Sequence, residues 1–171
     1  RNILSVTKVA NDHGIPVAYV EDVNSPEFIR SLRQMGPDVI INQAQAILKE
    51  EFLSVPMLGS LNRHGALLPK YRGRLAPFWA YVNGEKETGV SDQFIERKLD
   101  SGPIIVQKRV KIGRFDTLDS LLRKSFALAP DAMLEALDII RTGDYMDKLI
   151  DNDDESASYS SSPTLMDALK Y

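Results

Sequence analysis

Residues 25–41 have the sequence SPEFIRSLRQMGPDVII, which predicts a helix followed directly by a strand. Ser25 and Pro26 are typical of the first helical positions, because a serine hydroxyl caps free backbone N–H groups and proline lacks the N–H that would otherwise need a partner. Gly36 is typical of a helix end, since glycine readily adopts the left-handed conformation that closes the last turn. Residues 39–41 are all apolar, as in a parallel strand covered on both faces. A helix-to-strand unit of this kind indicates an α/β fold.

Weaker units of the same kind flank this one. Residues 6–10 carry apolar side chains at helical spacing and are followed by Gly14, after which residues 17–20 are expected to form a short strand. Residues 48–53 and 58–62 repeat the helix and strand less clearly. The fold expected is therefore α/β, a Rossmann-like and mostly parallel sheet with flanking helices.

The pattern changes after Gly73. Residues 77–82 are predicted to be helical, and residues 88–94 and 104–112 alternate as two strands around a tight turn. A long amphipathic helix is expected over residues 118–143.

We expect Asp116 or Thr117 to cap this long helix and Pro130 to bend it, because proline removes one backbone donor. The acidic and serine-rich composition of residues 147–171 predicts a tail that is loose or packs on something outside the chain. Residues 1–146 are thus expected to form the catalytic domain, and residues 147–171 a tail or the start of a C-terminal extension.

Composition limits the classes of protein. The chain has 171 residues, 43% of them hydrophobic, which suits one domain with a single core. A net charge of −3 gives no general attraction to nucleic acid. Without a cysteine or a long apolar stretch, we expect a cytoplasmic protein with neither disulfides nor a membrane partner.

Three polar residues could perform chemistry together. His64 follows a predicted parallel strand, where ligand sites of α/β sheets lie, whereas His13 precedes a glycine helix stop and is expected to cap that helix. Asn62 could donate to an oxyanion, and Asp100, in a Gly-Pro turn, could orient an imidazole. The alternatives are a structural loop histidine and a turn aspartate that bonds its own backbone.

Three ordered blocks resemble the signature of enzymes that use 10-formyltetrahydrofolate. They are NRHGALLPKYRG (residues 62–73), NGEKETGV (83–90) and LDSGPII (99–105). The family includes methionyl-tRNA, sugar-nucleotide and glycinamide ribonucleotide formyltransferases. The similarity spans roughly residues 15–144, and the spacing of Asn62 and Asp100 is similar to that of the family's catalytic pair.

This resemblance implies transfer of a formyl group from 10-formyltetrahydrofolate to an amine, with no metal. Asn62 and His64 would stabilise the tetrahedral oxyanion, and Asp100 would orient His64 and help to move protons. The resemblance also implies cofactor-binding residues on two loops, namely Gln45, Ala46, Ile47, Leu48, Glu96 and Leu99.

The sequence departs from the family pattern in three places. Ala66 stands where a serine is common, and Arg97 and Lys98 precede the turn of Asp100, where they could contact the glutamate tail of the folate. A complete family domain also begins with a further strand, helix and strand, so we expect a fragment or a short variant with an exposed sheet edge.

An amino sugar nucleotide or similar small amine is the acceptor expected from the sequence. A methionyl-tRNA acceptor stays open, although it would call for a further RNA-contacting domain. A hydrolase is disfavoured by Gly65, where hydrolases of this family usually have a second histidine. A non-catalytic folate-binding module is the fourth alternative, and a homo-oligomer also stays open.

Two groups of side chains have simpler interpretations. Lys70, Arg72 and Arg74 could contact RNA, but cations in a loop are commonly solvated. The aromatic residues of the 77–82 helix could line an acceptor pocket, but core packing is favoured.

Overall fold

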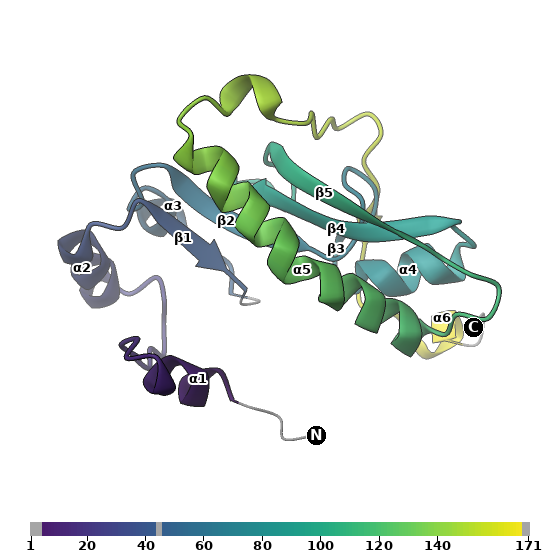
Figure 1. Cartoon of the computed structure of the whole chain (residues 1–171), viewed down its shortest axis with the longest axis horizontal. Helices are drawn as coiled ribbons and strands as arrows, with labels where there is room; N and C mark the ends of the chain where they lie inside the picture. The colour runs from purple at the N-terminus through teal and green to yellow at the C-terminus, as the bar shows by residue number, and fades with distance from the viewer. Residues whose placement is uncertain (1–4, 44–45, 169–171) are drawn as a thin grey trace.

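The computed structural model describes residues 5–43 and 46–168. Figure 1 shows a twisted sheet with one long helix across its front and the C-terminal segment returning behind it. The strands are β1 Val39–Asn42, β2 Gly59–His64, β3 Arg72–Gly73, β4 Glu87–Phe94, β5 Ile104–Lys111 and β6 Tyr159–Ser160. The helices are α1 Val6–Asp12, α2 Pro26–Met35, α3 Glu50–Leu53, α4 Ala76–Val82, α5 Leu118–Arg141 and α6 Leu165–Ala168, with a 3-10 turn at Met146–Lys148.

The main sheet has the strand order β1-β2-β4-β5. β1 and β2 are parallel, as expected, whereas β2–β4 and β4–β5 are antiparallel. The connection from β4 to β5 spans only residues 95–103, and a parallel crossover needs a dozen or more. The α/β class and the flanking helices are confirmed, with parallel pairing at β1–β2 and a hairpin at the other edge.

The core lies between the sheet and α5. Leu61 of β2, Val90 of β4 and Ile105 of β5 are buried against a stripe of small residues on α5 that includes Ala132 and Ala136. Alanines let the helix approach the sheet closely, and the apolar area they bury stabilises the fold by roughly 25 cal/mol per Å². This packing fixes which face of β2 and β4 is left for a site.

The predicted helix ends are confirmed where the cap residues act locally. The Ser25 Oγ accepts a hydrogen bond from the Phe28 N–H, and Gly36 closes α2 with a φ of 57°. Thr117 caps α5, which continues through Pro130. No helix in the part of the chain that the structure describes is both long and apolar enough to cross a lipid bilayer.

The strand predicted for residues 17–20 is wrong. This segment has no regular structure, and its Tyr19 side chain is 85% exposed. No described strand lies beside it to pair with its backbone, so β propensity alone could not form a strand. No described strand pairs with the outer edge of β1, so β1 is the edge strand of the described sheet. Its Ile41 side chain is exposed, whereas a strand covered on both faces was expected.

The expectation of a loose tail is also wrong for its central part. Residues 150–160 pair with the rest of the fold at two places. Ile150 bridges Ile104 of β5 in the main sheet, and β6 pairs in parallel with β3 to form a separate two-stranded sheet. Asn152 is buried although the segment around it is polar. Side-chain hydrogen bonds, which composition does not reveal, compensate for the apolar area that this segment lacks.

Candidate active site

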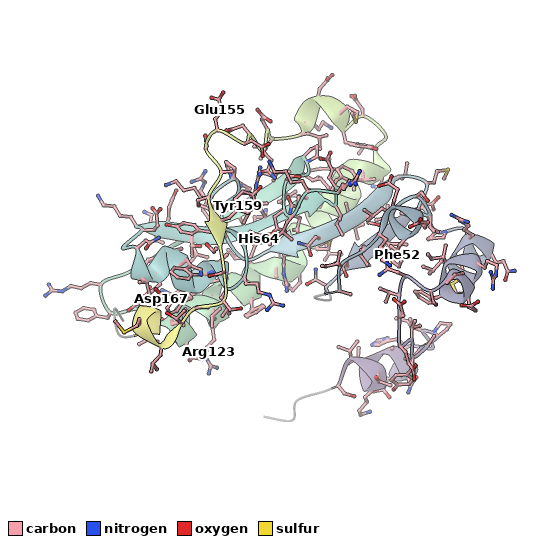
Figure 2. All side chains as sticks on the ribbon, turned by 180° about the vertical axis from the view of Figure 1, so that it is seen from behind. Phe52, His64, Arg123, Glu155, Tyr159 and Asp167 are labelled. Atoms are coloured by element: carbon pink, nitrogen blue, oxygen red, sulfur yellow. The ribbon has the colours of Figure 1, made fainter. Side chains whose placement is uncertain are left out.

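Asn62 and His64 share the face of β2 that points away from α5. Successive side chains of a strand alternate between faces, and Leu61 is buried against α5, so its neighbours at positions 62 and 64 point to the opposite side. His64 is the last residue of β2 and is only 5% exposed. Figure 2, which views the molecule from behind, shows His64 on the side where the tail with Tyr159 crosses.

The His64 ring lies between two oxygen atoms. Its Nδ1 is 3.5 Å from the Asp100 Oδ2, and its Nε2 is 2.8 Å from the Tyr71 carbonyl oxygen. Both neighbours are acceptors, while a neutral imidazole carries a single N–H. One of the two contacts therefore lacks a proton unless the ring is protonated.

Burial lowers the pKa of His64 below its usual value of 6.5. The Asp100 carboxylate and the Tyr71 carbonyl raise this pKa, and the Arg72 guanidinium lowers it, but burial is the largest of these effects. Since the net shift is downward, the imidazole is mostly neutral at pH 7 and can accept a proton.

Asp100 is held in an unusual backbone conformation. Its φ is 50°, in the left-handed region that residues other than glycine seldom adopt. Its Oδ2 accepts a hydrogen bond from the Gly73 N–H at 2.8 Å, and its Oδ1 accepts one from the Gln93 Nε2 at 3.2 Å. Its side chain is 9% exposed, so the carboxylate points inward, as the sequence predicted for this turn.

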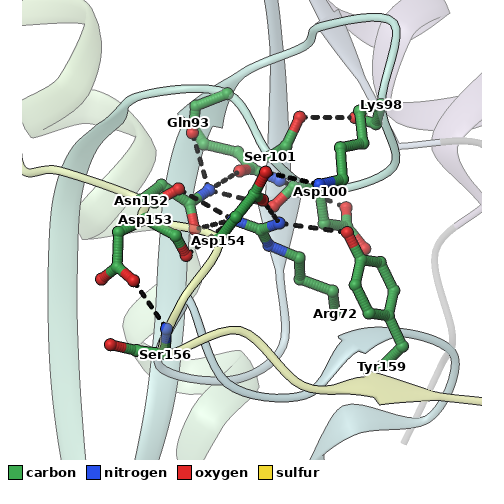
Figure 3. A network of polar contacts seen from close by, with 11 residues as sticks. Arg72, Gln93, Lys98, Asp100, Ser101, Asn152, Asp153, Asp154, Ser156 and Tyr159 are labelled. Carbon is green, nitrogen blue, oxygen red and sulfur yellow. Dashed lines mark hydrogen bonds and ion pairs between the residues drawn. The ribbon is translucent and has the colours of Figure 1, made fainter.

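Three residues of this network were missed by the sequence interpretation. Gln93, Arg72 and Asn152 connect Asp100 to the tail, as Figure 3 shows. Arg72 is fully buried, so the expectation of a solvated cation is wrong for it. The place of Arg72 in the NRHGALLPKYRG block could have indicated a role in the site. Asn152 lies in a polar segment whose composition gives no such indication.

The residues assigned to folate binding are dispersed over two loops. Ala46 and Ile47 are exposed and Leu48 is half-buried, whereas Gln45 lies outside the described residues. Glu96 and Leu99 are exposed on the loop before Asp100. The structure brings together Asn62, His64 and Asp100, whereas the described residues of the two loops make no hydrogen bond or ion pair with each other.

A cavity of about 430 Å³ lies beside the site, between the 70–71 loop, α4 and the tail. Tyr71, Trp79 and Tyr159 contribute to its lining, and the Trp79 Nε1 donates to the Ser161 carbonyl. Phe78 is buried, so core packing is confirmed for it, whereas Trp79 lines the cavity. Within residues 5–43 and 46–168 no three His, Asp or Glu side chains gather as metal ligands would.

The Formyl transferase family model matches residues 5–137 of the chain. A methionyl-tRNA formyltransferase of Kosmotoga olearia is 38% identical over 96% of the chain and 52% of that protein. The bifunctional polymyxin resistance protein ArnA of Wigglesworthia glossinidia brevipalpis is 43% identical over 70% of the chain and 18% of that protein. The chain spans about half the length of the first of these relatives.

A solved structure has the same architecture. The crystal structure of phosphoribosylglycinamide formyltransferase from Anaplasma phagocytophilum superposes with a TM-score of 0.74, at 26% identity, over 90% of this chain and 79% of that one.

Proposed function

Because the chain belongs to the formyl transferase family, we propose that it transfers a formyl group from 10-formyltetrahydrofolate to an acceptor amine. In this reaction the amine nitrogen bonds to the formyl carbon, the bond from that carbon to folate N10 breaks, and one proton passes from the amine to N10. The chain spans about half the length of its methionyl-tRNA formyltransferase relative, so the activity of the whole protein is part of what is proposed.

The observation that carries the proposal is the buried pair of His64 and Asp100. The Nδ1 to Oδ2 distance is 3.5 Å, and the pair stands beside Asn62 at the end of β2. A neutral amide, a proton-transfer group and a carboxylate are suited to attack on a carbonyl.

Each residue of this trio has a separate part in the proposal. The Asn62 side chain makes no hydrogen bond with any residue that the structure describes. Its amide is therefore available to donate to the developing oxyanion. Asp100 orients His64 and assists proton movement. A hydrogen bond from the His64 Nε2 to the formyl oxygen requires that oxygen to replace the Tyr71 carbonyl, which now lies 2.8 Å from Nε2.

The two exposed loops carry apolar side chains that suit folate binding. Ile47 and Leu99 offer exposed apolar side chains, and such surfaces suit a flat heterocycle when backbone groups bond its edge. We assign the folate to these loops, with Ala46, Leu48 and Glu96 beside them. Lys98 is engaged by Asp154 at 2.5 Å, so it could reach the glutamate tail of the folate only by leaving that carboxylate.

We prefer the α-amino group of methionyl-tRNA as the acceptor. The Kosmotoga olearia relative carries that name and aligns with nearly the whole chain. It is about twice as long as the chain, so an RNA-contacting region outside these residues would fit the proposal. The division of the chain at residue 147 stays a prediction.

A small amine, such as an amino sugar nucleotide, is the second candidate. One observation favours it, because the basic loop offers few free cations to RNA. Lys70 pairs with Glu85 and Arg72 is buried against the tail. A hydrolase is less favoured, because a Cβ on Gly65 would lie 3.2 Å from the Pro77 ring and leave little room for a histidine.

The test is to follow formyl loss from 10-formyltetrahydrofolate by absorbance with methionyl-tRNA, with a panel of amino sugar nucleotides and without acceptor. His64→Ala is the variant, and His13→Ala, at the exposed end of α1, is its matched control. Turnover with one acceptor that His64→Ala abolishes and His13→Ala retains supports the transferase and identifies its substrate.

Other outcomes would change the conclusion. Formyl loss without any acceptor would indicate a hydrolase. Folate binding without turnover in any arm would indicate a binding module.

A further inference from the structure

Asn152 connects the tail to the turn that carries Asp100. Its Nδ2 is within hydrogen-bond distance of three acceptors, namely the Asp100 carbonyl at 2.9 Å, the Gly102 carbonyl at 2.8 Å and the Gln93 Oε1 at 3.1 Å. Asn152 is 8% exposed, and Gln93 is fully buried. The two N–H groups of this amide are thus shared among two carbonyls of the Asp100 turn and the side chain that contacts the Asp100 carboxylate.

The direction of these hydrogen bonds is fixed by Arg72. A guanidinium only donates, so the Asn152 Oδ1, 2.9 Å from the Arg72 Nη2, must be the acceptor and the Asn152 NH2 must face the other way. That NH2 meets the Gln93 Oε1, which turns the Gln93 NH2 toward the Asp100 Oδ1. The series of donors therefore ends on the Asp100 carboxylate, which receives a hydrogen bond (Figure 3).

Arg72 is in turn held by the tail. Its guanidinium donates to the Asp154 carboxylate at 2.6 Å, to the Asn152 carbonyl at 2.8 Å and to the Tyr159 hydroxyl at 3.1 Å. The backbone of Tyr159 also pairs with Arg72 between β6 and β3. Residues 150–160 are thus attached at the Ile150 bridge, at Arg72 and at β6.

The same elements position the other side of Asp100. The Gly73 N–H, which donates to the Asp100 Oδ2, belongs to β3, and β3 is paired with the tail strand β6. Both carboxylate oxygens therefore depend on groups that the tail contacts. Without the tail, the strained backbone at Asp100 would lose the donor on its carbonyl and the amide that orients Gln93.

We propose that residues 150–160 position Asp100 for reaction, with Asn152 as the positioning residue and Arg72 as the group that orients it. This inference rests on the proposed function only in assigning a reaction to Asp100. The placement of Asp100 against His64 can be measured without turnover.

The experiment is an NMR titration of the His64 ring, together with steady-state kinetics. The chain has two histidines, so His13→Asn assigns the His64 signal. The variants are Asn152→Ala and, as a milder change that keeps one donor, Asn152→Ser. Asp151→Ala, the exposed neighbouring residue, is the matched control, and Asp100→Asn gives the reference for a lost carboxylate.

We expect Asn152→Ala to move the His64 titration to lower pH, in the same direction as Asp100→Asn, because Asp100 raises the pKa of His64. Asn152→Ser should show a smaller shift, and Asp151→Ala none. In the transfer assay, kcat should fall by about tenfold or more in Asn152→Ala, with the KM for folate changed by less than about threefold, since positioning acts on the chemical step.

Two results would overturn the inference. One is a His64 titration in both Asn152 variants that matches wild type, and the other is an equal effect of Asp151→Ala. If wild type shows no turnover, the proposed function fails, but the titration still decides whether the tail positions Asp100. If Asn152→Ala fails to fold, Asn152→Ser supplies the decision.

Discussion

The Nδ1 of His64 lies 3.5 Å from the Oδ2 of Asp100, and backbone groups hold both partners. The Tyr71 carbonyl contacts the far side of the imidazole, and the Gly73 N–H contacts the same carboxylate oxygen that faces the ring. Tyr71 directly precedes β3 and Gly73 is the last residue of β3, so a short piece of backbone sets both ends of the pair.

Asp100→Asn should reduce formyl transfer strongly. The amide keeps the shape of the carboxylate but removes the charge that raises the pKa of His64, so the imidazole becomes a weaker base. Loss of a positioned acid-base group typically reduces kcat by about 10²- to 10⁴-fold. Steady-state kinetics checks this, with Asp131→Asn, an exposed acid on α5 outside the proposed site, as the control. A loss of less than about threefold would argue against a catalytic carboxylate.

His64 should make the protein less stable in mild acid. Its folded pKa is lowered below 6.5, so the unfolded state binds more protons as the pH falls through 6.5. The contribution of His64 to the free energy of unfolding is therefore full above pH 6.5. It declines below that pH by at most about 1.4 kcal/mol per pH unit. Urea unfolding from pH 7 to pH 5 should show that wild type loses stability relative to His64→Gln. His13→Gln should follow wild type, and equal slopes in all three proteins would contradict the assignment.

Asp92 should act in the opposite sense. It is fully buried on β4, neither carboxylate oxygen has a hydrogen-bond partner among the described residues, and burial raises its pKa from 3.8 to about 6, although the charge of Arg63 opposes this. The folded state then binds more protons than the unfolded state between these two values, so this contribution to stability is lost as the pH rises through about 6.

Asp92→Asn should therefore stabilise the protein at pH 8. The full shift corresponds to about 3 kcal/mol at most, and the unpartnered amide should reduce the gain to about 1–2 kcal/mol. Denaturant midpoints at pH 8 and pH 4.5 test this, with Asp131→Asn on the exposed side of α5 as a control of equal charge. A variant that is less stable than wild type at pH 8 would show that Asp92 is charged and usefully paired.

Gly73→Ala should release the tail. A Cβ at this position, where φ is 100°, would overlap the Ser160 carbonyl oxygen of β6. Gly84→Ala is the matched control, since Gly84 has a φ of 70° but open space around it. Gly73→Ala should lose about 1–3 kcal/mol more stability than the control, and limited proteolysis should cut residues 150–160 faster. Equal proteolysis of the two variants would contradict the docking of β6 on β3.

The sequence by itself determined the elements whose signals are local. Ser25 and Gly36 bound α2 because a cap acts on atoms within one turn. Residues 88–94 lie in β4, as predicted, although residues 88–93 are buried on both faces of the strand rather than on alternate sides. The motifs of residues 62–73 and 99–105 indicate the trio of Asn62, His64 and Asp100, whose catalytic role stays a prediction.

Only the tertiary structure decided which segments meet. Residues 17–20 have strand propensity, but they pair with no strand that the structure describes. The polar tail docks through Asn152 and Arg72 rather than through apolar area. Pairing and buried hydrogen bonds depend on partners that are distant in sequence, so composition and periodicity carry no record of them. The position of Asp100 is set in this way, by a segment that its own sequence marks only as polar.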